Sequence, residues 1–231
     1  GLDLLEKLPA AREYFPDFKQ LRGMLKMKTA ADRFTLTLDD QIIQAALTQA
    51  VGKVRASAAR LQSANNLKQM ALAFHIAHDS NKAFPARANF DANGKPLLSW
   101  RVHILPYLEQ QNLYRQFKLN EPWDSPHNKN LIGKMPAIYQ SPLAKAGQDG
   151  KTTYLVPSGK GTAFAGPSGL RIQEFRDGTS NTILILEVSD EKAVVWTRPD
   201  DFEVNPKNPL AGLVLPQHKG FHAAFADGSV R

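Results

Sequence analysis

The sequence predicts an α+β protein in which one long helix in the N-terminal part packs on an antiparallel β-sheet, with extra loops and short helices. Residues 38–78 contain no proline and a single glycine, which is typical of one uninterrupted helix. From residue 84 onward lie most of the 15 prolines and 15 glycines, and the apolar runs become short. This change of composition indicates strands joined by loops.

The first 36 residues are expected to be the end of an upstream region. Short apolar stripes interrupted by prolines predict one or two short helices over residues 2–32. Alternating residues predict a short strand at 34–38. Because the chain starts with Gly1 and not with methionine, we interpret it as a piece of a longer precursor.

The long helix is predicted from apolar residues that recur at steps of three or four, along one stripe. These are Leu47, Val51, Val54, Ala58, Leu61, Ala64, Leu67, Ala71 and Phe74. Thr37 and Asp40 have the spacing of an N-cap followed by a carboxylate in the first turn. The polar face is basic, because no acidic residue occurs between Asp40 and Asp79. At about 1.5 Å per residue the helix would span roughly 60 Å, more than the core of one domain requires.

Residues 37–231 are expected to form the larger domain, with the helix at 38–78, a loop and helix region at 84–140 and an antiparallel sheet at 150–231. Within the middle region, residues 98–117 carry a second helical pattern. The predicted strands are Thr152–Val156, Thr182–Val188, Ala193–Thr197 and Phe221–Ala226. The pair Asp227-Gly228 follows the last of them and predicts a tight hairpin.

Composition excludes several classes of function. Cysteine is absent, which excludes disulfides, thiolate metal sites and a cysteine nucleophile. The formal charge is +7, but the basic residues are dispersed, which favours a solvated surface over a nucleic-acid groove. No apolar run reaches the roughly 18 residues of a membrane span. We therefore expect neither nucleic-acid binding nor a membrane span in this chain.

Several ordered motifs identify a resemblance to a known family. They are Asn65-Asn66-Leu67-Lys68-Gln69, Phe84-Pro85, Leu98-Ser99-Trp100-Arg101, Leu105-Pro106-Tyr107-Leu108-Glu109-Gln110, Glu121 to Asn128, Asp177 to Thr182 and Phe225 to Arg231. From about residue 38 to its end the chain resembles the pilin-like proteins of planctomycete bacteria catalogued as domain of unknown function 1559. The resemblance implies a pilin or pseudopilin relative, exported to the periplasm, the cell surface or the extracellular space.

The chain departs from the pattern of that family in two ways that affect its function. Relatives usually have a prepilin leader and an apolar helix start, whereas Asp39 and Asp40 occupy that place here. This difference favours a module on a larger exported protein over pilus assembly. Many relatives carry cysteines where Ser63 and Ser141 stand, so the resemblance implies that two serines replace a helix-to-loop disulfide.

The first functional hypothesis is a non-enzymatic structural or interaction module. Its expected partners are other protein subunits or the upstream part of its own precursor, and it needs no cofactor. The sequence shows no Gly-x-Ser-x-Gly elbow, no P-loop and no His-Glu-x-x-His element. Histidines 75 and 78 are interpreted as packing residues on the helix.

The alternative hypothesis is a module that binds calcium or an extracellular glycan. Asp177, Thr179 and Asn181 offer oxygen ligands that suit calcium, although Asp-Gly-Thr-Ser-Asn is first of all good turn chemistry. Further candidate binding residues are Trp123, Asp124 and His127 in one loop, and His218 and Asp227 near the C-terminus. We expect His218 and His222 to form a polar cluster near Asp227 that braces the last hairpin.

Overall fold

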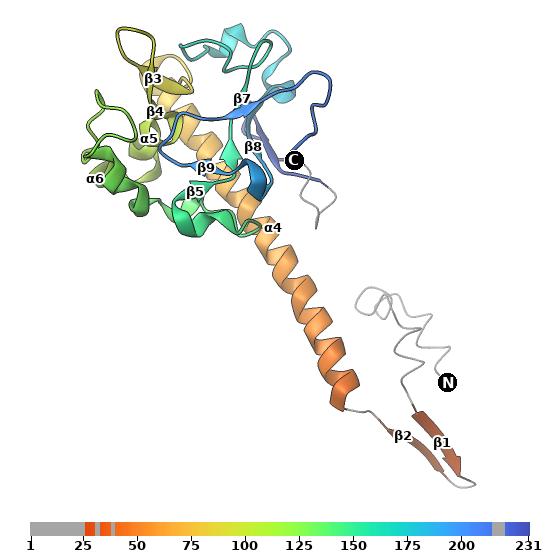
Figure 1. Ribbon diagram of the computed structural model, residues 1–231. Coiled ribbons are helices and arrows are strands. Elements are labelled where there is room, and N and C mark those ends of the chain that lie inside the picture. Colours follow the sequence, from red (N-terminus) through yellow and green to blue (C-terminus); the bar gives the residue numbers. More distant parts are fainter. Residues whose placement is uncertain (1–25, 31–32, 38–39, 214–219) are drawn as a thin grey trace. The chain divides into compact units, whose positions relative to one another are not determined.

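The chain divides into two compact units, residues 1–59 and residues 60–231. The computed structural model describes residues 26–30, 33–37, 40–213 and 220–231 (Figure 1). The short helices predicted before residue 26, the acidic residue Asp39 and the candidate His218 lie outside these ranges.

A hairpin precedes the long helix. Strand β1 (Lys26–Ala30) pairs antiparallel with β2 (Arg33–Thr37), and Thr29 lies opposite Phe34. The strand predicted at 34–38 is confirmed by β2. The helical prediction is wrong for Lys26–Ala30, because pairing with β2 satisfies the backbone of this segment and overrides its weak helical pattern.

The long helix is confirmed as α4 (Asp40–Asn81), whose residues fall partly in the first unit and partly in the second. It ends three residues later than predicted. The amide of Lys82 still donates to the His78 carbonyl oxygen at 2.7 Å, and Lys82 then takes a left-handed conformation with φ 62°. A left-handed residue directly after the last turn is a common way to stop a helix.

The main core of residues 60–231 forms on one face of α4. Leu67, Met70 and Phe74 are fully buried there and belong to one apolar cluster with Trp100 and Ile185. Phe74 meets the edge of Trp100 at 5.2 Å between ring centroids. Burial of this face therefore fixes the C-terminal half of α4 to the strands that follow (Figure 1).

The strands form small sheets instead of the single sheet that the sequence suggested. The three-stranded sheet has the order β11 (Ala223–Phe225), β8 (Ile183–Glu187), β6 (Tyr154–Leu155), and its pairs are antiparallel. Strand β5 (Lys151–Thr152) pairs antiparallel with β9 (Val194–Val195). Strand β3 (Ala88–Phe90) pairs antiparallel with β4 (Pro96–Ser99). Strand β7 (Pro157–Ser158) pairs in parallel with β10 (Phe202–Glu203). The predicted strand Thr152–Val156 is thus split between two sheets.

The helical pattern of residues 98–117 becomes three short turns. They are α5 (Trp100–His103), a 3₁₀ helix (Leu105–Leu108) and α6 (Gln111–Tyr114). One continuous helix is excluded because Pro106 lacks an amide proton and Glu109 adopts φ 60°. Further 3₁₀ helices are Asn128–Lys134, Ala137–Tyr139, Ala146–Asp149, Ile172–Glu174, Thr179–Asn181 and Asp190–Lys192.

The C-terminal hairpin is confirmed. The Phe225 amide donates to the Ser229 carbonyl oxygen at 2.8 Å, and Ala224 bridges to Val230. Gly228 has φ 82°, a conformation in which glycine carries no side-chain strain. The turn at Asp227-Gly228 thus places the last residues of the chain beside β11.

Candidate functional site

The carboxylate of Glu187 lies at the centre of a buried polar cluster. Glu187 ends β8 and its side chain is 1% exposed. Ser63 Oγ, from α4, donates to Glu187 Oε2 at 2.7 Å, and Ser141 Oγ, from a loop, donates to Oε1. His222 Nδ1 lies 3.0 Å from Oε2. One carboxylate therefore joins the long helix, a loop and the segment that leads into β11.

The hydrogen bonds around Ser63 have a definite direction. A serine hydroxyl has one proton, and Ser63 gives that proton to Glu187. The contact of 2.9 Å between Ser63 Oγ and Tyr154 Oη therefore has the phenol as donor. Burial, with the nearby charge of Glu187, raises the pKa of Tyr154 to about 12, so the phenol keeps its proton. Asn66 Nδ2 in turn donates to Tyr154 Oη at 3.4 Å.

This cluster has the contacts of a buried structural hydrogen-bond network. In a catalytic arrangement the serine donates to a base, which a third group orients. Here Ser63 and Ser141 donate directly to the carboxylate, and both serines are buried. The two serines at which the resemblance implies a lost disulfide are thus linked through Glu187. The cluster joins elements far apart in the sequence by hydrogen bonds.

A second buried polar group lies beside β4 and β6. Arg101 Nη2 and Asp201 Oδ1 form a 2.9 Å ion pair in which neither side chain is exposed. Ser99 Oγ accepts from Arg101 Nη1 at 2.7 Å, and the Tyr154 carbonyl oxygen accepts from Nε at 3.0 Å. Burial lowers the pKa of Arg101 and raises the pKa of Asp201, and the attraction between the two charges opposes both shifts. Asp201 Oδ1 also accepts from Trp100 Nε1 and from the Val156 amide, so the pair links the Trp100 side chain to the backbone near β6.

The segment Asp177 to Asn181, for which the sequence favoured a turn and left calcium binding as the alternative, forms a turn in the structure. Asn181 Nδ2 donates to the Asp177 carbonyl oxygen at 2.9 Å, and Thr182 Oγ1 donates to the Gly178 carbonyl oxygen at 3.1 Å. Thr179 begins the short 3₁₀ helix Thr179–Asn181. Over the described part of the chain, no three His, Asp or Glu side chains converge in a way that could hold a metal ion. The observed contacts are those of local turn chemistry.

The three candidate residues of the loop predicted to bind ligand have different surroundings. Trp123 is partly buried, and the Arg198 guanidinium lies 5.4 Å from its ring centroid. His127 is exposed and its Nε2 lies 2.8 Å from the Gln116 carbonyl oxygen. Asp124 is exposed. Trp123 and His127 thus contact different residues of their own domain, Arg198 and Gln116.

The predicted C-terminal cluster is also different from the observed one. Asp227 is exposed, and its Oδ1 accepts from the Ser229 amide at 2.8 Å. Hydrogen bonds from Ser229 lower the pKa of Asp227. His222 binds Glu187, whereas the prediction placed it with Asp227. Sequence reasoning missed Glu187 because a carboxylate at the end of an apolar strand resembles an ordinary strand terminus.

The opposite face of α4 presents apolar side chains to solvent. We call Leu47, Val51, Val54, Ala58 and Leu61 the α4 stripe. All five are exposed, and Leu47, Val54 and Leu61 keep 59%, 69% and 66% of their surface accessible. Their spacing of four, three, four and three residues keeps them on one side of the helix. The sequence prediction of one stripe is right for these residues, but Leu67, Ala71 and Phe74 turn into the core instead.

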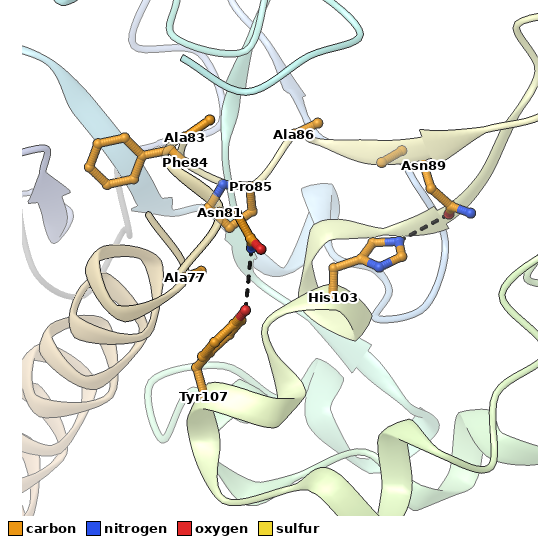
Figure 2. A pocket seen from close by; sticks show the side chains of 10 residues that line it. Ala77, Asn81, Ala83, Phe84, Pro85, Ala86, Asn89, His103 and Tyr107 are labelled. Atoms are coloured by element: carbon orange, nitrogen blue, oxygen red, sulfur yellow. Dashed lines mark hydrogen bonds between the residues drawn. The ribbon is translucent and has the colours of Figure 1, made fainter. Parts of the chain in front are cut away.

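A small cavity lies where α4 ends. Its volume is about 270 Å³, and Figure 2 shows the side chains around it. Asn81 Nδ2 donates to Tyr107 Oη at 3.3 Å, and His103 Nε2 lies 3.0 Å from Asn89 Oδ1. Phe84 and other apolar residues complete its lining. Burial lowers the pKa of His103 to about 4, so this imidazole is neutral at neutral pH.

These features define an α+β protein whose long helix is anchored to small antiparallel sheets by a buried carboxylate and leaves an apolar stripe exposed. No described helix is long and apolar enough to cross a membrane. A family model described as "Protein of unknown function (DUF1559)" matches residues 52–219. The chain belongs to this family. Comparison with curated proteins and with solved structures gave no match.

Proposed function

We propose that this chain is a non-enzymatic, exported, pilin-like structural module that associates with another protein through the α4 stripe. The observation that carries the proposal is the exposure of Leu47, Val54 and Leu61 on one side of a helix. Isolated exposed apolar residues are ordinary, but a contiguous exposed apolar strip is typical of an interaction surface.

The spacing of the α4 stripe suits a helical partner. Residues that alternate steps of four and three are the a and d positions of a coiled-coil seam, into which a second helix packs its own side chains. Burying one Leu or Val side chain contributes about 1.5–3 kcal/mol. Burial of the four large residues of the stripe would therefore oppose the cost of association with a partner.

Charge favours a partner with acidic residues over a second copy of this chain. Lys53, Arg55 and Lys68 are exposed along α4, and no acidic residue lies between Asp40 and Asp79. Two such helices side by side repel each other at low ionic strength. An acidic segment of another subunit, or of the upstream part of the precursor, complements the basic residues instead.

The buried polar cluster supports a structural role over a catalytic one. Ser63 and Ser141 use their protons to hold Glu187, and Tyr154 keeps its proton. These groups contribute to the internal structure of the domain. Export and the pilin-like character rest on the resemblance of the motifs and on the helix-and-sheet architecture.

Association through the α4 stripe is tested by light scattering after size-exclusion chromatography. We expect the purified chain to self-associate at high concentration in about 0.5 M NaCl, where the repulsion between basic helices is screened. Val54→Asp and Leu61→Asp should abolish this association, while Gln49→Asp, on another face of α4, should retain it. A monomeric mass at every concentration and salt level, or equal self-association of Val54→Asp and the parent, would contradict the α4 stripe as an association surface.

A further inference from the structure

We propose that the cavity at the C-terminal end of α4 binds one uncharged pyranose ring. This site is separate from the α4 stripe and does not depend on the proposed function. It is formed by the end of α4, the segment after it, β3, α5 and the 3₁₀ helix Leu105–Leu108 (Figure 2).

The polar side of the cavity offers both a donor and an acceptor. Tyr107 Oη accepts the bond from Asn81 Nδ2, and a phenol that accepts one hydrogen bond still has its own proton to donate. The Asn81 carboxamide also has an oxygen, which accepts. In Figure 2 these two side chains point toward each other at the edge of the cavity. Such a neighbouring donor and acceptor match a pair of adjacent hydroxyl groups.

The second polar pair is fixed and neutral. Asn89 Oδ1 accepts from the Leu98 amide at 3.0 Å, and Asn89 Nδ2 donates to the Leu119 carbonyl oxygen at 2.7 Å, which fixes the orientation of the carboxamide. His103 Nε2 must then donate to Asn89 Oδ1, because a carboxamide oxygen only accepts. The tautomer of His103 is thus set by the fold.

The lining carries no formal charge. Among the described residues that line the cavity there is no Asp, Glu, Lys or Arg, and His103 is neutral. A charged ligand would lose its hydration without a counter-charge to replace it. A pure hydrocarbon would in turn give no hydrogen-bond partner to the phenol proton of Tyr107 or to the carboxamide oxygen of Asn81.

Size and apolar lining favour a single sugar ring. At about 30 Å³ per water-sized group, the observed volume of about 270 Å³ accommodates roughly nine non-hydrogen atoms, which is enough for the six ring atoms and some of their substituents, so the remaining substituents of a methyl glycoside would stay in solvent. Ala77, Pro85 and Ala86 give the cavity small apolar groups, against which the C–H face of a pyranose packs while its hydroxyls reach the polar side. The Phe84 ring points away from the cavity (Figure 2) and packs in the core against Phe74 and Phe175. Small clefts of this mixed character are typical ligand sites.

The test uses methyl glycosides of glucose, galactose, mannose and N-acetylglucosamine, observed by saturation-transfer difference NMR with the whole chain. At least one of them should bind with a Kd on the order of 1 mM, the range expected for so few contact atoms. Cyclohexanol, which lacks adjacent hydroxyls, and glucuronate, which is charged, should bind at least several-fold more weakly.

Two variants locate the site. Tyr107→Phe removes the donated proton and keeps the ring, and should weaken binding about fivefold or more. Tyr114→Phe is the matched control, because it removes a phenol hydroxyl that does not line the cavity, and should leave binding unchanged. Absence of saturation transfer from all four glycosides, equal binding of cyclohexanol or glucuronate, or equal binding by Tyr107→Phe would overturn the proposal.

Discussion

Ser63 Oγ donates a 2.7 Å hydrogen bond to Glu187 Oε2, across 124 positions of sequence. The bond connects α4 to β8, the central strand of the three-stranded sheet. Ser141 binds the other oxygen of the same carboxylate. Where the resemblance implies a disulfide in relatives, this chain has two hydroxyls bound to one buried carboxylate, so it retains the connection without a covalent bond.

Replacing Glu187 should destabilise the fold strongly. Glu187→Ala leaves Ser63, Ser141 and His222 without their shared acceptor, and we expect a loss of about 3 kcal/mol in the free energy of unfolding. Urea unfolding followed by circular dichroism measures this loss. Glu191→Ala, at an exposed position, is the control and should stay within about 0.5 kcal/mol of the parent. Equal stability of the two variants would show that the cluster contributes little.

His103 should make the stability depend on pH. Burial lowers its folded pKa from 6.5 to about 4, so the unfolded chain binds the proton first. The contribution of neutral His103 to the free energy of unfolding is fully present above pH 6.5 and is lost as the pH falls toward 4. We expect unfolding at about pH 4.5 to cost roughly 2–3 kcal/mol less than at about pH 7.5 from this group.

A pair of variants isolates that contribution. His103→Gln has no titrating group and should reduce the loss of stability between these pH values by roughly 2 kcal/mol. Asn112→Gln, at an exposed position, changes no titrating group and should leave the pH profile unchanged. A profile that is the same in His103→Gln as in the parent would exclude His103 as its cause.

Gly169 is required by a close approach of two segments. A Cβ built on Gly169 would lie 1.6 Å from the Phe84 carbonyl oxygen, and the Phe84 amide donates to Leu170 at 2.8 Å. Gly169→Ala forces the backbone apart, and we expect a loss of about 3 kcal/mol or more. Gly133→Ala is the control because nothing lies within 4 Å of its Cβ, and it should be neutral or slightly stabilising. Comparable melting temperatures for both variants would refute this packing.

Calcium should not stabilise the chain. The side chain of Asn181 is bound to the Asp177 carbonyl oxygen as part of a turn, so binding calcium there would require this turn to rearrange. We expect the same melting temperature in calcium and in EDTA, and a loss of about 1 kcal/mol in Asn181→Ala from the missing hydrogen bond. An increase in Tm with calcium that Asp177→Ala abolishes would restore the calcium hypothesis.

Local patterns predicted most of the elements but not their arrangement. The absence of proline predicted α4, and Asp227-Gly228 predicted the final hairpin, because both depend on backbone preferences of nearby residues. Pairing between segments far apart in the sequence decided how the strands are arranged in sheets. Thr152 and Tyr154 lie in one predicted strand, yet they pair with β9 and β8, which belong to different sheets.

The buried polar clusters could not be predicted from the sequence, because they too join residues that are far apart in the chain. Arg101 and Asp201 are 100 residues apart, and neither neighbourhood indicates that its charge is buried. The motif Leu98-Ser99-Trp100-Arg101 did mark the region, but the partner of Arg101 depends on the tertiary fold. Ser63 and Ser141 were singled out only through the resemblance, and the carboxylate between them was not.

Photo-crosslinking from the α4 stripe tests the proposed association most directly. The chain has no cysteine, so Val54→Cys can be labelled at a single position with a benzophenone. Gln49→Cys is exposed and lies about 140° around the helix from residue 54, which makes it the matched control. Irradiation of the purified chain, and of the labelled chain in an extract of its source cells, should give a defined crosslinked species from residue 54 and much less from residue 49. No crosslink from residue 54, or equal yields from both positions, would contradict association through this face.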